Sequence, residues 1–197
     1  MDLKLRGRTA LITGASKGIG RAIAGVLAAE GCKLILVSRT AADLEATRKD
    51  IAASHNVAVV TRALDLSVST AIHELATAHP DIDILVNNAG AIPGGRLSEV
   101  DDARWRQSWD LKVFGYINLT RAIYTQMKAR GGGVIVNDIG AAGEKFDANY
   151  ICGSAGNAAL MSFTRALGGK SLADNIRVVG INPGPVGTDR HVTLLKT

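Results

Sequence analysis

The stretch Thr13-Gly14-Ala15-Ser16-Lys17-Gly18-Ile19-Gly20 joins a predicted strand, residues 9–13, to a predicted helix, residues 18–30. Its glycines can adopt positive φ and let backbone amides approach a ligand closely. The helix start adds unpaired N–H groups and the positive end of the helix dipole. Because the motif lies between a strand and a helix, it predicts a turn that binds the phosphates of a dinucleotide; the alternative is a purely structural turn.

Apolar runs of strand length alternate with segments of helical periodicity along the chain. Runs rich in β-branched residues and leucine predict strands at 9–13, 33–37, 57–60, 82–86, 133–136 and 176–181. The segments between them predict helices at 18–30, 41–54, 67–78, 103–130 and 154–168. Right-handed crossovers then give an α/β fold with a doubly wound parallel sheet of strand order 3-2-1-4-5-6. No linker divides the chain, so residues 1–197 form a single predicted domain.

The composition is that of an ordinary globular protein. Of 197 residues, 47% are hydrophobic and 21% charged, with a net charge of +5. The basic residues are scattered, no apolar run is long enough to cross a membrane, and Cys32 and Cys152 stand in no metal-binding spacing. We therefore expect a cytoplasmic protein that binds a small molecule, without a nucleic-acid, membrane or metal site.

The end of the second predicted strand indicates which dinucleotide binds. It reads Val37-Ser38-Arg39-Thr40. An acidic residue here would bind the ribose 2′-hydroxyl of NAD, whereas an arginine would contact the 2′-phosphate of NADP. Arg39 stands here without an acid, and Lys17 adds a second cation. The sequence therefore predicts NADP(H) in preference to NAD(H); the alternative is that both are solvated surface charges.

Four motifs in chain order carry a family resemblance. They are the glycine motif at 13–20, Asp65-Leu66, Asn87-Asn88-Ala89-Gly90 and Asn182-Pro-Gly-Pro-Val-Gly-Thr188. With them the chain resembles the short-chain dehydrogenase/reductase family over nearly its whole length. The resemblance implies that Asn88 braces the central strand and that a nicotinamide dinucleotide is bound by Gly14, Ser16, Lys17, Gly18, Ile19, Gly20, Asp65, Leu66, Asn87, Ala89, Gly90, Pro183, Gly184, Val186 and Thr188.

Members of this family reduce carbonyls or oxidise alcohols with a tyrosine, a lysine, a serine and an asparagine. Hydride transfer leaves an alkoxide that must be protonated by a nearby donor. The flanks of residues 136–143 place Gly140 where the serine is expected, and those of residues 105–115 place Lys112 at the asparagine position.

Two alignments are open for the tyrosine and the lysine. One starts from Tyr150 and puts Ser154 four residues later. The other needs no gap along residues 153–167 and puts Gly153 at the tyrosine position and Asn157 at the lysine position. We prefer the second, because a packed helix tolerates no three-residue slip. All four usual catalytic positions are then substituted.

A relocated site is one explanation of these substitutions. Tyr150 lies three residues before Gly153, so its hydroxyl would reach the same space if the helix extends that far. Lys112 would supply the nearby charge. In the alternative, Tyr150 packs in a loop and Lys112 pairs with a carboxylate such as Asp138 or Asp110.

Two functions follow from these residues. The first is an NADP(H)-dependent oxidoreductase for a carbonyl or alcohol substrate, with an atypical active site. The second is a catalytically inactive dinucleotide-binding homologue with a structural or regulatory role. The resemblance also implies a homo-oligomer, dimer or tetramer, through the helices at 103–130 and 154–168. We further expect that the C-terminal strand and substrate lid of the family are missing after the sixth strand.

Overall fold

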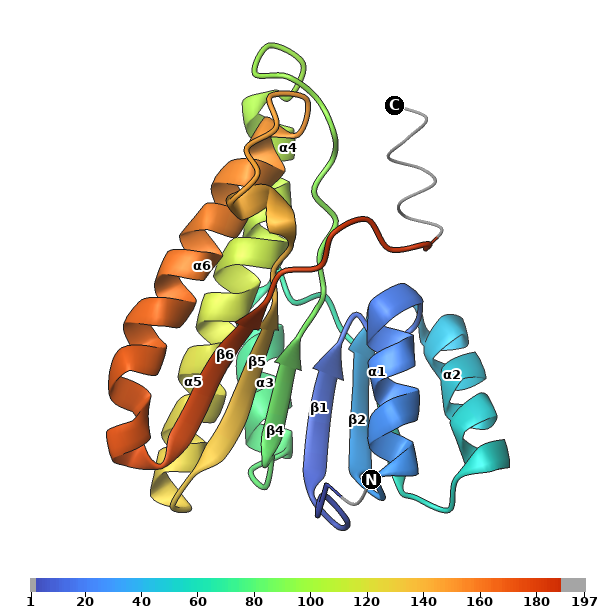
Figure 1. Ribbon diagram of the computed structural model, residues 1–197. Coiled ribbons are helices and arrows are strands. Elements are labelled where there is room, and N and C mark those ends of the chain that lie inside the picture. The colour runs from blue at the N-terminus through green and yellow to red at the C-terminus, as the bar shows by residue number, and fades with distance from the viewer. Residues whose placement is uncertain (1–2, 189–197) are drawn as a thin grey trace.

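Six parallel strands form one sheet in the order β3-β2-β1-β4-β5-β6, which confirms the predicted fold class (Figure 1). The computed structural model describes residues 3–188. The expected absence of a further strand and a lid concerns the chain after Thr188, outside the described residues. The strands are β1 (Thr9–Thr13), β2 (Lys33–Ser38), β3 (Val59–Ala63), β4 (Ile84–Asn87), β5 (Gly133–Asp138) and β6 (Ile176–Ile181).

The helices lie close to their predicted positions. They are α1 (Gly18–Ala29), α2 (Ala41–Ser54), α3 (Ser69–Ala78), α4 (Asp102–Trp109), α5 (Gly115–Ala129) and α6 (Ile151–Ser171). The long helix predicted at 103–130 is divided into α4 and α5 by a π-helical turn, η1 (Asp110–Phe114). Short 3-10 turns, η2 (Ala141–Gly143) and η3 (Leu172–Asp174), precede and follow α6. None of the helices within residues 3–188 combines the length and apolar character that crossing a bilayer requires.

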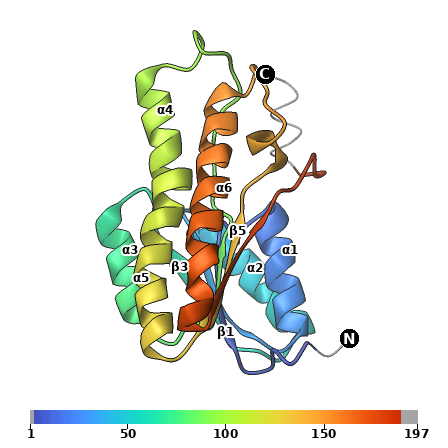
Figure 2. The ribbon, with the colours of Figure 1, turned by 60° about the vertical axis from the view of Figure 1, so that its left-hand side comes forward.

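Helices cover both faces of the sheet (Figure 2). Side chains alternate along β1, so Ala10 and Ile12 pack in the core beneath α1 and α2. Leu11, between them, packs with Leu119 of α5 in the core on the other face. This double burial explains why the predicted strands are nearly continuous apolar runs.

A buried amide network joins the sheet to α5 and α6. The Nδ2 of Asn87 donates to Thr120 Oγ1 at 3.0 Å and to Asn137 Oδ1 at 2.9 Å. The Nδ2 of Asn137 donates in turn to Thr164 Oγ1 at 2.9 Å. All four residues are buried. Hydrogen bonds in such a network are strong because no water competes for them.

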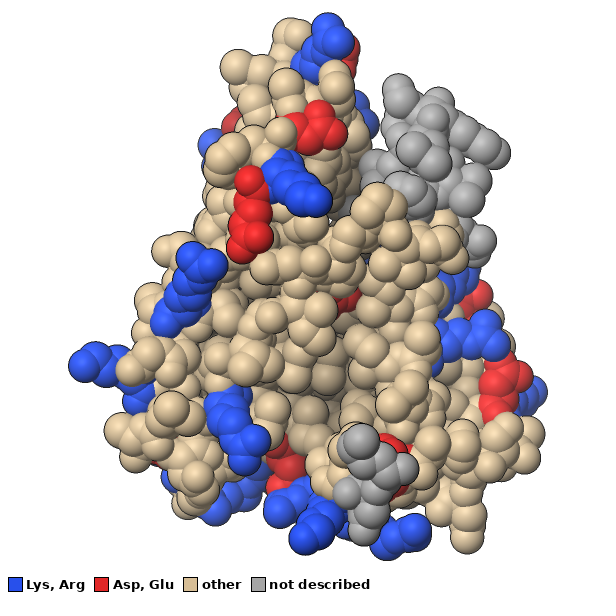
Figure 3. All heavy atoms as spheres, viewed as in Figure 1, with Lys and Arg blue, Asp and Glu red and all other residues tan. Residues whose placement is uncertain are grey.

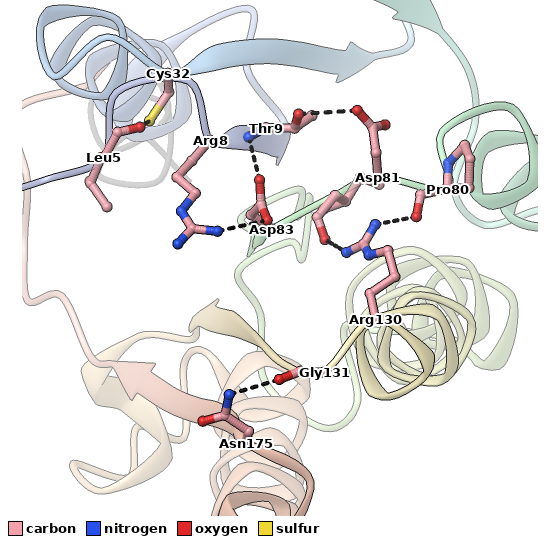
Figure 4. A network of polar contacts seen from close by, with 11 residues as sticks. Leu5, Arg8, Thr9, Cys32, Pro80, Asp81, Asp83, Arg130, Gly131 and Asn175 are labelled. Atoms are coloured by element: carbon pink, nitrogen blue, oxygen red, sulfur yellow. Dashed lines mark hydrogen bonds and ion pairs between the residues drawn. The ribbon is translucent and has the colours of Figure 1, made fainter.

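A second polar network holds together the amino ends of the strands (Figure 4). Asp83 accepts hydrogen bonds from the backbone N of Thr9 at 2.8 Å and from Arg8 at 3.3 Å. Arg130, at the end of α5, donates to the carbonyl oxygens of Pro80 and Ile82. These contacts fix the end of the sheet opposite to the glycine motif and leave the carboxyl ends of the strands for a ligand.

The amide network gives a first prediction. Replacing Asn137 by Ala leaves the partners on Asn87 and Thr164 buried without it, so we expect the free energy of unfolding to fall by about 2–3 kcal/mol. Replacing the exposed Asn56 by Ala is the matched control, with an expected change below about 0.5 kcal/mol. Urea unfolding of both variants measures the difference, and equal midpoints would contradict this role of the network.

Candidate functional site

The loop after β1 is held by residues that follow β4. The side-chain Nδ2 of Asn88 donates to the carbonyl oxygens of Thr13, at 2.8 Å, and Gly14, at 3.2 Å. The hydroxyl of Thr13 accepts from the backbone N of Asn88 at 2.8 Å and of Ala89 at 3.0 Å. These bonds join neighbouring strands at the point where the strand order reverses, which is where ligands bind in open α/β sheets.

Close packing explains two glycines of the motif. A Cβ on Gly14 would lie 2.6 Å from Asn88 Nδ2, and the φ of Gly14 is +65°. A Cβ on Gly20 would overlap the carbonyl oxygen of Gly14. The loop therefore keeps its shape only without side chains at these places, and it leads directly into the start of α1. Lys17 is the N-cap residue and its side chain makes no capping bond, which suits a helix start that binds an anion.

Ser38 ends β2 and Arg39 follows it, while Lys17, at the start of α1, pairs with the first turn of α2. Arg39 is exposed, and Lys17 Nζ lies 3.0 Å from Asp43 Oδ2 in an exposed ion pair. The hydroxyl of Ser38 is buried and has no hydrogen-bond partner within residues 3–188. A buried polar atom without a partner is unfavourable. This place therefore offers positive charge and a hydroxyl for a polar ligand.

Asp65 and Leu66 follow β3 on different sides. Asp65 is exposed and accepts hydrogen bonds from the backbone N of Ser67 at 3.0 Å and from its hydroxyl at 2.8 Å. These bonds hold the pKa of Asp65 below its usual value, and the charge of Arg39 adds to the effect. The side chain of Leu66 is 4% exposed and packs in the core. Only Asp65 of this pair therefore presents its side chain to solvent.

The residues at the end of β4 and after it point to different places. The side chain of Asn87 belongs to the buried amide network, on the face of the sheet that α5 covers. Gly90 is half-buried, and a Cβ there would lie 2.9 Å from Cδ of Lys112. Ala89 and Gly90 thus lead from the glycine motif toward Lys112.

Lys112 reaches the carboxyl end of β5 from the π-helical turn. Its Nζ donates to the carbonyl oxygen of Ile139 at 2.7 Å and lies 5.8 Å from the ring centroid of Tyr116. Burial raises the pKa of Asp138 above its usual value, and the charge of Lys112 opposes that rise. A π-helical turn often marks a functional site, because its extra residue turns a side chain in a new direction.

Asn157 lies close to Gly140, the residue after the carbonyl that Lys112 binds. Gly140 has a φ of +120°, and a Cβ there would lie 3.0 Å from Asn157 Nδ2. Asn157 is 3% exposed, and its Oδ1 has no hydrogen-bond partner among the described residues. The structure thus brings together three of the predicted substituted positions: Lys112, Gly140 and Asn157.

The ring of Tyr150 occupies the place where a side chain at position 153 would begin. A Cβ on Gly153 would overlap the Cε1 and Cζ atoms of this ring. Tyr150 is the N-cap residue of α6, which begins at Ile151, and its carbonyl oxygen accepts the first helical hydrogen bond from the backbone N of Ser154 at 2.8 Å. The same ring packs against a small core of Ile92, Val100 and Cys152.

The loop after β6 lies beside the residues that follow β5 and beside the start of α1. The carbonyl oxygen of Pro183 accepts from the backbone N of Ala141 at 2.9 Å, and a Cβ on Gly18 would lie 3.3 Å from Thr188 Cγ2. Gly184 and Val186, between them, are exposed. A groove of about 630 Å³ runs between α1 and residues 186–188, and includes Gly18 and Ile19.

The surface on this side is not one basic patch. In Figure 3, Lys and Arg lie mainly along the lower rim and the flanks, and side chains of other types cover the centre.

Sequence reasoning did not single out the hydroxyl of Ser38 or the carbonyl oxygen of Ile139. The place of Ser38 at the end of a strand was visible, but burial of its hydroxyl depends on the neighbouring strands. A backbone carbonyl carries no signal in the sequence at all. Both belong to the site by position, at the carboxyl ends of β2 and β5.

Two glycines on one helix give the second prediction. We expect Gly20→Ala to lower the free energy of unfolding by about 2 kcal/mol, because its Cβ meets a backbone carbonyl. Gly25→Ala is the control: a Cβ at Gly25 meets nothing within 4 Å, so alanine is expected to stabilise by about 0.5–1 kcal/mol. Thermal unfolding compares them, and two shifts of the same sign would contradict the close packing of the loop.

Comparison with known proteins adds to this geometry. A family model described as short chain dehydrogenase matches residues 8–197. Galactitol 2-dehydrogenase (L-tagatose-forming) of Cereibacter sphaeroides is 35% identical over 191 residues, which are 94% of this chain and 74% of that protein. The 3-oxoacyl-[acyl-carrier-protein] reductase FabG of Escherichia coli is 30% identical, over 95% of this chain and 77% of that protein.

Solved structures are similar over almost all of the chain. L-sorbose reductase from Gluconobacter frateurii, in complex with NADPH and L-sorbose, has a TM-score of 0.91 and 33% identity. The match covers 96% of this chain and 73% of that one. YwfH, an NADPH-dependent reductase involved in bacilysin biosynthesis, has a TM-score of 0.91 and 28% identity, with 96% of this chain and 77% of that one covered.

Proposed function

The chain belongs to the short-chain dehydrogenase family, and on this premise we propose that it is an NADP(H)-dependent oxidoreductase for a carbonyl or alcohol substrate. The observation that carries the proposal is the braced glycine loop between β1 and α1, with its backbone held open by Asn88. Two of the similar solved structures are described as an NADPH complex and an NADPH-dependent reductase. Relatives named for galactitol and sorbose make polyols and keto sugars the first substrates to test.

The residues present fit a nicotinamide dinucleotide. The glycine loop and the start of α1 would hold the pyrophosphate, since the first turn of α1 presents backbone N–H groups that no side chain caps. The buried hydroxyl of Ser38 and the buried Oδ1 of Asn157 lack partners among the described residues, and a dinucleotide has polar groups to offer both. We propose further that Asp65, Ala89, Gly90, Pro183 and Thr188 border the cofactor, as the resemblance implies.

A preference for NADP(H) rests on Arg39. Arg39 is exposed and directly follows Ser38 at the end of β2, where a ribose 2′-phosphate would accept hydrogen bonds from its guanidinium. Lys17 contributes less, because Asp43 already neutralises its ammonium. The acid that would favour NAD is missing from the end of β2.

Reversing this charge gives the third prediction. Arg39→Asp is expected to weaken NADPH binding by about 100-fold and to leave NADH binding equal or tighter, because a carboxylate repels the 2′-phosphate and accepts from a 2′-hydroxyl. Equilibrium titrations of both nucleotides measure the ratio of dissociation constants. Arg121→Asp on α5 is the control, with an unchanged ratio. The same ratio in all three proteins would refute the role of Arg39.

The proton that completes carbonyl reduction must come from this chain or from water. When bound, the reduced cofactor supplies a hydride to the carbonyl carbon. The carbonyl electron pair then moves to oxygen, which takes up a proton. We propose Tyr150 as the donor, because its ring extends over Gly153 and its packing against Ile92 and Cys152 holds the phenol in one position.

The fourth prediction follows from this assignment. Tyr150→Phe keeps the packed ring and removes only the hydroxyl, so we expect kcat to fall about 100-fold while the unfolding temperature stays the same. Tyr124→Phe, which removes a hydroxyl on α5 that donates to Asp174, is the control with unchanged kcat. Initial rates of NADPH oxidation give kcat for both variants. A kcat for Tyr150→Phe within threefold of the unsubstituted enzyme would eliminate Tyr150 as donor.

The glycines at 140 and 153 favour a second candidate function. Neither offers a side chain for chemistry, so the protein could bind NADPH in a structural or regulatory role without hydride transfer. The two functions differ in one assay, oxidation of NADPH with polyol-derived ketones, aldehydes and quinones as acceptors. Turnover above background supports the oxidoreductase, and saturable binding without any turnover supports the inactive homologue.

We also propose a cytoplasmic homo-oligomer. Its support is the family resemblance together with the small residues Ala155, Ala158 and Ala159 on α6, which are exposed or half-buried and would allow close helix packing.

A further inference from the structure

A cation and an amide both lie close to the backbone of Ile139 and Gly140. Lys112 comes from the π-helical turn between α4 and α5, and its Nζ donates to the carbonyl oxygen of Ile139 at 2.7 Å. Asn157 comes from α6, and its Nδ2 lies 3.0 Å from the place of a Cβ on Gly140. Ile139 and Gly140 are neighbours directly after β5, so both side chains converge on one turn of backbone.

The stem of Lys112 is held in place. A Cβ on Gly90 would lie 2.9 Å from Cδ of Lys112, so the glycine gives room for the stem to pass. The ammonium also lies 5.8 Å from the ring centroid of Tyr116, a distance at which the ring attracts a cation. This positive charge is therefore fixed at the carboxyl ends of β4 and β5.

Asn157, whose Nδ2 lies near Gly140, also has a buried acceptor without a partner among the described residues. The residue is 3% exposed, and its Oδ1 has no hydrogen-bond partner within the part of the chain that the structure describes. Leaving a buried amide oxygen unpaired is unfavourable, and a leucine of similar size would avoid it. A ligand that donates a hydroxyl to this oxygen would explain why an amide stands there.

The position within the sheet narrows down the ligand group. A dinucleotide in an open α/β sheet crosses the carboxyl ends of the strands where their order reverses, here between β1 and β4. The glycine loop and Arg39 lie on the β1–β2 side. Lys112 and Asn157 lie on the β4–β5 side, where the second half of the dinucleotide carries a ribose with two hydroxyls.

We propose that Asn157 and Lys112 together hold this second ribose, with Asn157 Oδ1 as acceptor of a ribose hydroxyl and Lys112 as the fixed cation beside it. The inference rests on the proposed function. In the alignment with the family, Lys112 stands at the position of the asparagine and Asn157 at the position of the lysine, so the two residue types have exchanged positions. Their contributions to NADPH affinity are coupled, because the ribose needs one cation and one amide beside it.

Single variants test the contact by affinity and stability together. Asn157→Leu and Lys112→Met are each expected to bind NADPH about tenfold more weakly. Asn157→Leu is also expected to unfold at the same or a higher temperature without nucleotide, because it removes an unpaired buried oxygen. A merely structural asparagine would give the reverse: a lower unfolding temperature and unchanged affinity. Lys170→Met and Asn56→Leu, on exposed positions, are the controls with unchanged NADPH affinity.

The exchange itself is tested by swapping the residues. Lys112→Asn leaves no cation and Asn157→Lys leaves two, so each alone is expected to lose about tenfold in affinity. The double variant restores one cation and one amide and is expected to bind NADPH within about threefold of the unsubstituted protein. If the two losses of NADPH affinity simply add in the double variant, the proposed coupling of Lys112 and Asn157 is wrong.

Fluorescence titration with NADPH measures every variant without requiring turnover. If the unsubstituted protein does not bind NADPH, the proposed function fails. If it binds and Asn157→Leu binds equally well, only the present inference is overturned.

Discussion

The hydrogen bonds between Asn88 and the Thr13-Gly14 backbone fix the geometry on which the site depends. They tie the loop after β1 to the end of β4, and these two strands are neighbours across the point where the strand order reverses. Because the Asn88 amide fills the space beside the loop, Gly14 and Gly20 have no room for side chains. The site has one half at the ends of β1 and β2 and a second half at the ends of β4 and β5. The same bonds fix how the two halves lie relative to each other.

Much of the fold could be predicted from the sequence, because strands buried on both faces are continuous apolar runs. The predicted strand at 57–60 is the exception: β3 covers Val59–Ala63, since pairing with β2 decides its bounds and Thr61 and Arg62 are polar. The division of the predicted helix at 103–130 was also missed. A π-helical turn needs no proline or glycine, so no residue type announces it.

The site was predictable where it depends on backbone and less where it depends on side-chain direction. The glycine loop follows from its own residues. The direction of Asn87, into the buried amide network, depends on Thr120 and Asn137, which come from distant segments. No local pattern encodes this contact, because it depends on the packed structure. The ring of Tyr150, by contrast, lies at Gly153, as the spacing of three residues at a helix start indicates.

The central claim is that the loop after β1 and the end of β2 bind the adenosine side of a dinucleotide, whether or not the substituted catalytic positions allow hydride transfer. Isothermal titration of the unsubstituted protein with 2′-phospho-ADP tests it most directly, because this fragment lacks the second ribose and carries only the groups that we propose to bind at the ends of β1 and β2. The account predicts saturable binding to one site per chain, from which NADPH displaces the fragment. Absence of saturable binding of both the fragment and NADPH would contradict it.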